Sequence, residues 1–182
     1  MKIEMTKAGS RGFCDEVTYI KTNYVRVHSN PGRPAKTMTN YMAIRIIGFF
    51  IVALVALYLA VSTKDPIYIA VTIAMAIAVV AVFLSYSGSR KKVYEMMDDD
   101  STKTLEMTEE GVSYKDGKTS LKYSWEDISC VALNKRSITF FPVKRAMEPF
   151  FIDTEYKDQV IQGLKEAEHG YLLEDNVSRG AE

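Results

Sequence analysis

Two pairs of adjacent basic residues are the side chains in this 182-residue sequence that best suit the recognition of an anion. Lys135-Arg136 and Lys144-Arg145 flank a short run of β-forming residues, 137–141, so each pair is predicted to follow or precede a strand. Together they could form a basic cluster that binds a phosphorylated headgroup or an acidic peptide through charge-assisted hydrogen bonds. The alternative is a solvated loop whose charges protect an edge strand from aggregation.

Adjacent carboxylates occur at Glu109-Glu110, at Glu126-Asp127 and at Asp98-Asp99-Asp100. General acid–base catalysis needs two carboxyl groups held in one pocket in different environments, whereas neighbouring acids in a turn are usually just solvated. The sequence has no glycine-rich phosphate loop, nucleophile elbow or Ser/His/Asp order. We therefore predict that the protein is not an enzyme and needs no cofactor.

The cysteines and histidines give no metal-binding pattern. His28 and His169 are far apart and lack acidic or thiol companions at ligand spacing. Cys14 and Cys130 are predicted to be reduced and unpaired, because the topology inferred below places both in the cytoplasm.

Trp125 and Ile128 bracket Glu126 and Asp127 in a segment that has two interpretations. The segment could be a binding epitope. The alternative is that Trp125 and Ile128 are core anchors, because one large aromatic is a typical contribution to the core of so small a domain. We expect the second arrangement, with Phe140 of the 137–141 run as a further anchor.

The spacing of apolar residues predicts the strands and the helix that carry these side chains. Alternating short runs bounded by turn signals predict six strands, at 104–108, 112–115, 120–124, 129–133, 137–141 and 150–152. From Glu155 the apolar period changes to that of a helix, which Gly170 ends. Residues 87–170 are thus expected to form one small antiparallel α+β domain, with 171–182 as a flexible tail.

Two apolar runs, about 43–61 and 67–86, are the strongest signal in the chain. About 20 helical residues cover the roughly 30 Å hydrocarbon core of a bilayer, so the runs predict a transmembrane hairpin over residues 42–86. The rival interpretation is a pair of buried helices, but a chain of this size could hardly surround both. Small residues at four-residue spacing (Ala56 and Ala60, then Ala70, Ala74 and Ala78) predict close packing of the two helices.

Basic residues flank the two ends of the hairpin that open away from its short loop. Arg45 begins the first run, and Arg90, Lys91 and Lys92 follow the second. The positive-inside rule then predicts a multi-pass protein of the cell (inner or plasma) membrane with both termini in the cytoplasm. The net charge is zero, and 19 acids face 11 bases from Val93 onward, which argues against nucleic-acid binding.

The first 41 residues are predicted to be a cytoplasmic arm with β-strand character. The stretch from Val17 to Val27 mixes Tyr, Ile and Val with polar residues and is expected to be extended. It is too short to form a core alone, so it is expected either to be loose or to lean on the C-terminal domain.

The order of two apolar helices, a basic exit, "GVSYKDGKTSLKYSWEDIS", "ITFFPVKRAM" and a terminal helix resembles the bacterial YcxB-like family. The matching positions are Gly111, the Trp125–Ile128 step and the Pro142–Ala146 segment, where Val143 is inserted before the basic pair. The resemblance covers about residues 42–168. It implies a two-pass inner-membrane protein with a cytoplasmic domain similar to pleckstrin-homology (PH)-like folds, which often bind headgroups or acidic peptides through basic loops. It implies no reaction.

Three functional hypotheses remain open at this point. The first is a membrane-anchored binding or scaffold module whose cytoplasmic domain engages a protein partner, with a membrane-embedded protein as one candidate. The second is an immunity-type membrane protein that intercepts a membrane-active toxin or peptide. The third is a sensor of anionic lipid headgroups. The sequence leaves the partner and the formation of a homo-oligomer undecided.

Overall fold

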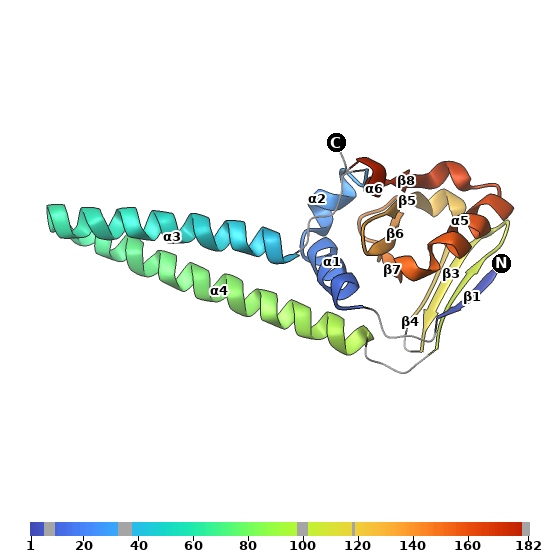
Figure 1. Ribbon diagram of the computed structural model, residues 1–182, viewed down its shortest axis with the longest axis horizontal. Helices are drawn as coiled ribbons and strands as arrows, with labels where there is room; N and C mark the ends of the chain where they lie inside the picture. The colour runs from blue at the N-terminus through green and yellow to red at the C-terminus, as the bar shows by residue number, and fades with distance from the viewer. Residues whose placement is uncertain (6–9, 33–37, 98–101, 118, 180–182) are drawn as a thin grey trace.

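The computed structural model describes residues 1–5, 10–32, 38–97, 102–117 and 119–179. The predicted acidic run 98–100 lies outside these residues. Figure 1 shows a long antiparallel pair of helices at one end and a β domain of two four-stranded sheets at the other. Two shorter helices lie between them. The expected α+β class is therefore confirmed at this level.

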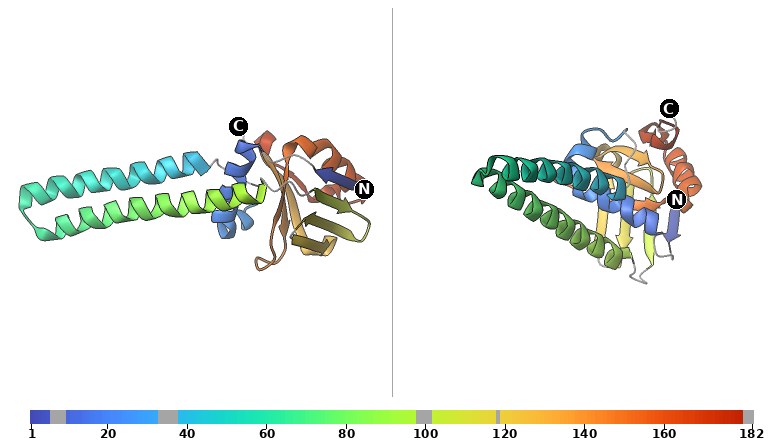
Figure 2. Two further views of the ribbon diagram at one scale, coloured as in Figure 1. Left: turned by 90° about the horizontal axis from the view of Figure 1, so that it is seen from below. Right: turned by 60° about the vertical axis from the view of Figure 1, so that its left-hand side comes forward.

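Helices α3 (Met38–Thr63) and α4 (Pro66–Met97) form the antiparallel pair, which both views of Figure 2 show projecting from the β domain. The turn between them holds Lys64 at a φ of 56°, and Asp65 Oδ1 accepts a hydrogen bond from the Ile67 amide at 2.9 Å. Within these helices, Ala43–Thr63 and Pro66–Glu95 are long and apolar enough to cross a membrane. Helix α4 continues about three turns past residue 86, so the three basic residues at 90–92 are helical.

The outer surface of the helix pair is apolar. Ile51, Leu54 and Ile77, for example, are each at least half exposed. Ala56 and Ala60 are buried where α3 packs on α4, whereas Ala70 and Ala74 are exposed. Of the small residues predicted on α4, Ala78 is half-buried, so the close contact involves mainly the small residues of α3.

The first sheet is antiparallel and recruits a strand from the beginning of the chain. Its order is β1 (Lys2–Met5), β2 (Lys103–Met107), β3 (Gly111–Asp116) and β4 (Thr119–Ser124). Ile3 lies opposite Leu105, and both side chains are buried. The chain thus leaves the β domain after β1, forms the helix pair and returns as β2.

The second sheet is mixed, with the order β7 (Phe150–Asp153), β6 (Ser137–Pro142), β5 (Ile128–Leu133) and β8 (Leu173–Asp175). Strand β8 runs parallel to β5 and is followed by the short helix α6 (Asn176–Arg179). The prediction of a flexible tail over 171–182 is therefore wrong up to Arg179. The buried amide of Asn176 anchors this segment by donating to Asn134 Oδ1 at 2.9 Å and to the Pro31 carbonyl at 2.8 Å.

The main core lies between the two sheets and helix α5 (Lys157–Glu166). The three predicted anchors, Trp125, Ile128 and Phe140, are buried in it. The Trp125 indole donates to the Thr108 carbonyl at 2.8 Å, and the Phe140 ring stacks on Phe150 with 4.4 Å between centroids. A Cβ at Gly163 of α5 would overlap the flexible end of the Met107 side chain, which would have to move aside to admit it.

The segment predicted to be extended at 17–27 is helical instead. It forms the second half of α1 (Arg11–Thr22) and most of α2 (Tyr24–His28), with a break at Asn23. The Ser10 side chain caps α1 by accepting from the Phe13 amide at 3.2 Å. Burial decides the outcome, because the helical period places the apolar side chains of α1 on one face against the second sheet.

Candidate functional site

Helix α1 connects the helix pair to the β domain. Its apolar residues Phe13, Val17 and Ile20 are almost completely buried in a second hydrophobic cluster on the outer face of the second sheet. The sheet contributes Cys130, Ala132, Phe141 and Phe151 to this cluster, and α4 contributes Val93. Contacts of α1 with both α3 and α4 complete the layer. The β domain is therefore held against one end of the helix pair through α1.

A buried carboxyl group lies within this layer. Glu16 is 2% exposed, and its Oε2 accepts a hydrogen bond from the Arg136 amide at 2.6 Å. Among the described residues, Oε1 has no hydrogen-bond partner. Burial raises the pKa of Glu16 to about 7, and the amides of the β5–β6 turn oppose that rise only in part. The group can therefore change its charge near neutral pH.

The neighbouring residue forms an ion pair with α4. Arg90 Nε lies 3.1 Å from Asp15 Oδ1, and both side chains are mostly shielded from solvent. The guanidinium also lies near the rings of Tyr86 and Tyr94, at 6.0 and 5.2 Å, and donates to the Tyr94 hydroxyl at 3.2 Å. Arg90 was predicted to act only as a topology signal, but the structure gives it a specific contact with α1.

A groove lies at the end of α1, along α2. It is lined by Lys21, Tyr24, Val25, Arg26, Ser29 and Arg145, with three polar neighbours. The Arg145 Nη2 donates to Ser29 Oγ at 2.6 Å, which brings the loop after β6 against the end of α2. Val25 is 64% exposed on this surface. We call this surface the α2 groove.

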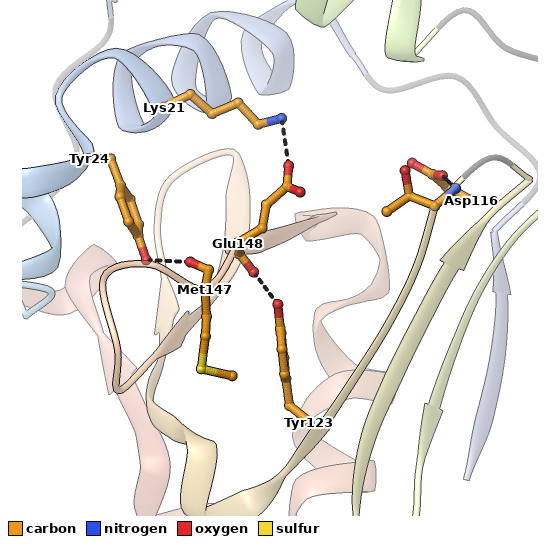
Figure 3. A network of polar contacts seen from close by, with 7 residues as sticks. Lys21, Tyr24, Asp116, Tyr123, Met147 and Glu148 are labelled. Atoms are coloured by element: carbon orange, nitrogen blue, oxygen red, sulfur yellow. Dashed lines mark hydrogen bonds and ion pairs between the residues drawn. The ribbon is translucent and has the colours of Figure 1, made fainter.

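Figure 3 shows how the loop after β6 is held beside this groove. The Tyr24 hydroxyl donates to the Met147 carbonyl at 3.4 Å, and the Tyr123 hydroxyl donates to the Glu148 carbonyl at 2.9 Å. Lys21 Nζ lies 3.9 Å from Glu148 Oε1. Burial raises the pKa of Tyr24 to about 12, so its hydroxyl keeps its proton at neutral pH. These contacts join α1, α2 and β4 around one loop.

The structure separates the two basic pairs that were expected to form one cluster. Lys135-Arg136 lies before β6 and Lys144-Arg145 lies after it, and the six residues of this strand span about 20 Å. All four side chains are exposed. Arg136 lies beside Gly12 of α1, whereas Arg145 joins Lys21 and Arg26 in the α2 groove. Arg145 is thus the only predicted binding residue among those that line this groove.

The remaining predicted residues lie elsewhere. Arg45 and Lys92 are exposed on α3 and α4, and Lys91 pairs with Glu95 at 3.8 Å. Cys14 and Cys130 are buried and form no disulfide, and burial raises the pKa of both thiols, that of Cys130 to about 12. In the part of the chain that the structure describes, no group of three or more His, Cys, Asp or Glu side chains could hold a metal ion.

Sequence reasoning missed Glu16, Asp15, Lys21 and Arg26 as site residues, because their segment was expected to be extended. A helical signal is present: Phe13, Val17, Ile20, Tyr24 and Val27 follow the spacing of one helix face.

Comparisons with protein-family models, curated proteins and solved structures found no match to this chain.

Proposed function

We propose that this protein is a non-enzymatic, membrane-anchored binding module that holds an acidic segment of a protein partner in the α2 groove. In this proposal α3 and α4 cross the membrane as a hairpin, and the β domain is a PH-like module on the cytoplasmic side, as the resemblance to the YcxB-like family implies. The partner is itself associated with the membrane.

Membrane placement is supported by the surface of the helix pair. Its exposed side chains are largely apolar over the two spans, which would be unfavourable in water across so large an area. Basic residues gather at the end that carries the β domain, and the opposite turn offers only Lys64 beside Asp65. That asymmetry favours a cytoplasmic β domain.

The composition of the α2 groove is the observation that carries the proposal of an acidic partner. Lys21 and Arg26 come from α1 and α2, and Arg145 comes from the loop after β6. Among the described residues that line the groove there is no carboxylate, although Lys21 also lies 3.9 Å from Glu148 beside it. The exposed Val25 offers an apolar contact beside Arg26 and Arg145. Such a combination suits a peptide segment that has both acidic and apolar side chains.

Two groups with raised pKa values, Glu16 and Cys130, are buried and do not lie at a cleft. Glu16 and Cys130 owe their raised pKa values to burial between packed layers. A catalytic group is expected instead at a cleft that a substrate can reach.

Membrane placement can be tested by thiol labelling of intact cells. In a chain that carries Cys14→Ala and Cys130→Ala, a cysteine at Thr63 should react with an impermeant maleimide, and a cysteine at the exposed Ser178 should react only after permeabilisation. Equal labelling of both positions before permeabilisation would contradict the topology. The native cysteines cannot serve this purpose, because their burial would block labelling on either side.

Partner binding can be tested by photo-crosslinking in the cells that produce the protein. A photoreactive residue at Val25 should yield a discrete adduct with one membrane-associated protein, and Arg26→Glu with Arg145→Glu should abolish it. A photoreactive residue at the exposed Val177 should not yield that adduct. An adduct that survives both charge reversals would overturn the acidic-partner proposal and move attention to the apolar faces of the hairpin, where a toxin or peptide would bind.

A further inference from the structure

A second groove lies where the beginning of α1 meets the C-terminal part of α4. It is lined by Arg11, Phe83, Tyr86, Arg90, Lys91 and Tyr94, together with Ser87. Phe83, Tyr86, Arg90 and Tyr94 are spaced by three or four residues, so they form one face of α4. Arg11 is the first residue of α1, so the groove lies at the junction between the helix pair and the α1 layer that contacts the β domain.

The groove changes character along its length. Phe83, at one end, is 56% exposed and lies in the continuous apolar run 67–86, which ends before the basic residues at 90–92. Lys91 lies eight residues further along α4, about 12 Å at the usual helical rise, and is exposed, as is Arg11. A surface that is apolar at one end and cationic at the other matches an amphipathic ligand that has an anionic head.

Arg90 is held in place between these two ends. Its contacts with Asp15 and with the Tyr94 hydroxyl fix the guanidinium against the wall of the groove. A guanidinium has five N–H donors, which is more than these two contacts use. Arg90 can therefore support an additional oxyanion without breaking the link to α1.

We propose that this groove binds an anionic glycerophospholipid, with the phosphate between Arg11, Arg90 and Lys91 and an acyl chain along Phe83. This proposal rests on the membrane placement of the hairpin in the proposed function. The lipid would join α1 to α4 and so tie the β domain to the inner leaflet. Arginine and lysine bind phosphate through charge-assisted hydrogen bonds, and the cytoplasmic leaflet is rich in lipids with a net negative headgroup.

Adjacent lysines provide a matched control. Lys91 and Lys92 carry the same charge and differ by one residue in depth along α4, but only Lys91 lines the groove. A diffuse attraction of anionic lipid to the basic end of the hairpin would depend equally on both. A specific site would depend on Lys91 and on Arg11, which lies on a different helix.

The test is native mass spectrometry of the full chain in detergent, titrated with phosphatidylglycerol or phosphatidylcholine. We expect phosphatidylglycerol to bind about tenfold more tightly than phosphatidylcholine. Arg11→Gln and Lys91→Gln should each remove most of this preference, whereas Lys92→Gln should change it by less than about twofold. A fluorescence measurement of unfolding shows that each variant is folded before the titration.

Three results would overturn the inference. If Lys91→Gln and Lys92→Gln weaken the preference for phosphatidylglycerol equally, the preference comes from diffuse electrostatic attraction and not from a specific site. Competition by inorganic phosphate at the concentration of the lipid would indicate an inorganic anion site. Equal binding of the two lipids would exclude recognition of the anionic head. The thiol-labelling experiment is independent, because a chain that fails it can still be titrated in detergent, so failure of the placement and failure of the lipid site are distinguishable.

Discussion

The two faces of the second sheet are both buried, yet they are built differently. The inner face, with Phe140 and Ile138, packs on the first sheet and α5 in an almost wholly apolar core. The outer face, with Phe141 and Cys130, is covered by α1 and reaches the helix pair, and Glu16 is buried beside it. The inner face therefore holds the β domain together, and the outer face sets how that domain is joined to the hairpin.

The chain provides a separate reporter for each face. Trp125 is the single tryptophan and lies in the inner core, so its fluorescence follows the unfolding of that core. Cys14 and Cys130 lie in the outer cluster, so the reactivity of their thiols follows the opening of the α1 layer. Both reporters require the full chain, because β1 and β8 extend the sheets beyond both ends of the predicted domain, 87–170.

The largest effect is expected from Phe140→Ala. Removing this fully buried ring should lower the free energy of unfolding by about 3–5 kcal/mol, because the cavity adds to the lost burial. The matched variant is Phe141→Ala, which removes an equally buried ring from the other face. It should mainly increase thiol reactivity while shifting the tryptophan transition less. Urea titrations that give equal shifts of that transition would show that the two faces unfold as one unit.

The next effect concerns the charge of Glu16. Its pKa is raised to about 7 in the folded protein, above its ordinary value, so the folded state binds more protons than the unfolded state over this range. The stability of the wild type should therefore fall as the pH rises through about 7. Glu16→Gln should not follow this fall, and its advantage over wild type should grow by roughly 1–3 kcal/mol between pH 5 and pH 8.

Urea titrations of both proteins at pH 5 and pH 8 measure this difference. Glu4→Gln is the control, because the exposed Glu4 pairs with Lys2, which lowers the pKa of Glu4, and its carboxyl group stays ionised at both pH values. A constant difference between Glu16→Gln and wild type would show that water reaches Glu16 in the folded protein. The outer face would then lack the pH sensitivity that distinguishes it from the inner one.

A smaller effect is expected from the Asp15–Arg90 ion pair that links α1 to α4. In a double-mutant cycle with Asp15→Asn and Arg90→Gln, we expect a coupling free energy of about 1 kcal/mol, since both groups are mostly shielded from solvent. The rate of Cys130 labelling by a thiol reagent measures the opening of the outer face. Additive effects of the two changes would mean that the apolar contacts of α1 alone hold the helix pair.

The smallest effect on stability is expected at the second basic pair. Arg145→Ala removes an exposed contact with Ser29, and Lys144→Ala removes an exposed side chain that does not line the α2 groove. Each should change the free energy of unfolding by no more than about 0.5 kcal/mol. Only Arg145→Ala should weaken the crosslink formed at Val25. Equal weakening by both variants would extend the binding surface beyond the α2 groove.

The helical layer shows why part of the candidate site was not predicted. Tyr, Ile, Val and Thr between residues 17 and 27 favour a strand by local propensity, but that preference is weak and depends on the surroundings. Starting four residues earlier, at Phe13, reveals the helical period, and Ser10 supplies the cap. The prediction considered residues 17–27 alone, and this range was too short to show the helical period. Asp15, Glu16 and Arg26 were therefore not considered as site residues.

The sequence alone determined the elements whose signals are local. Continuous apolar runs identified α3 and α4, and alternation identified the six strands from β2 to β7 to within two residues. Tertiary structure alone decided which elements far apart in the chain became neighbours. Strand β1 pairs with β2 across the whole hairpin, and Glu16 meets the Arg136 amide across 120 residues. Such contacts follow from burying apolar faces together, and no periodicity within a single segment records them.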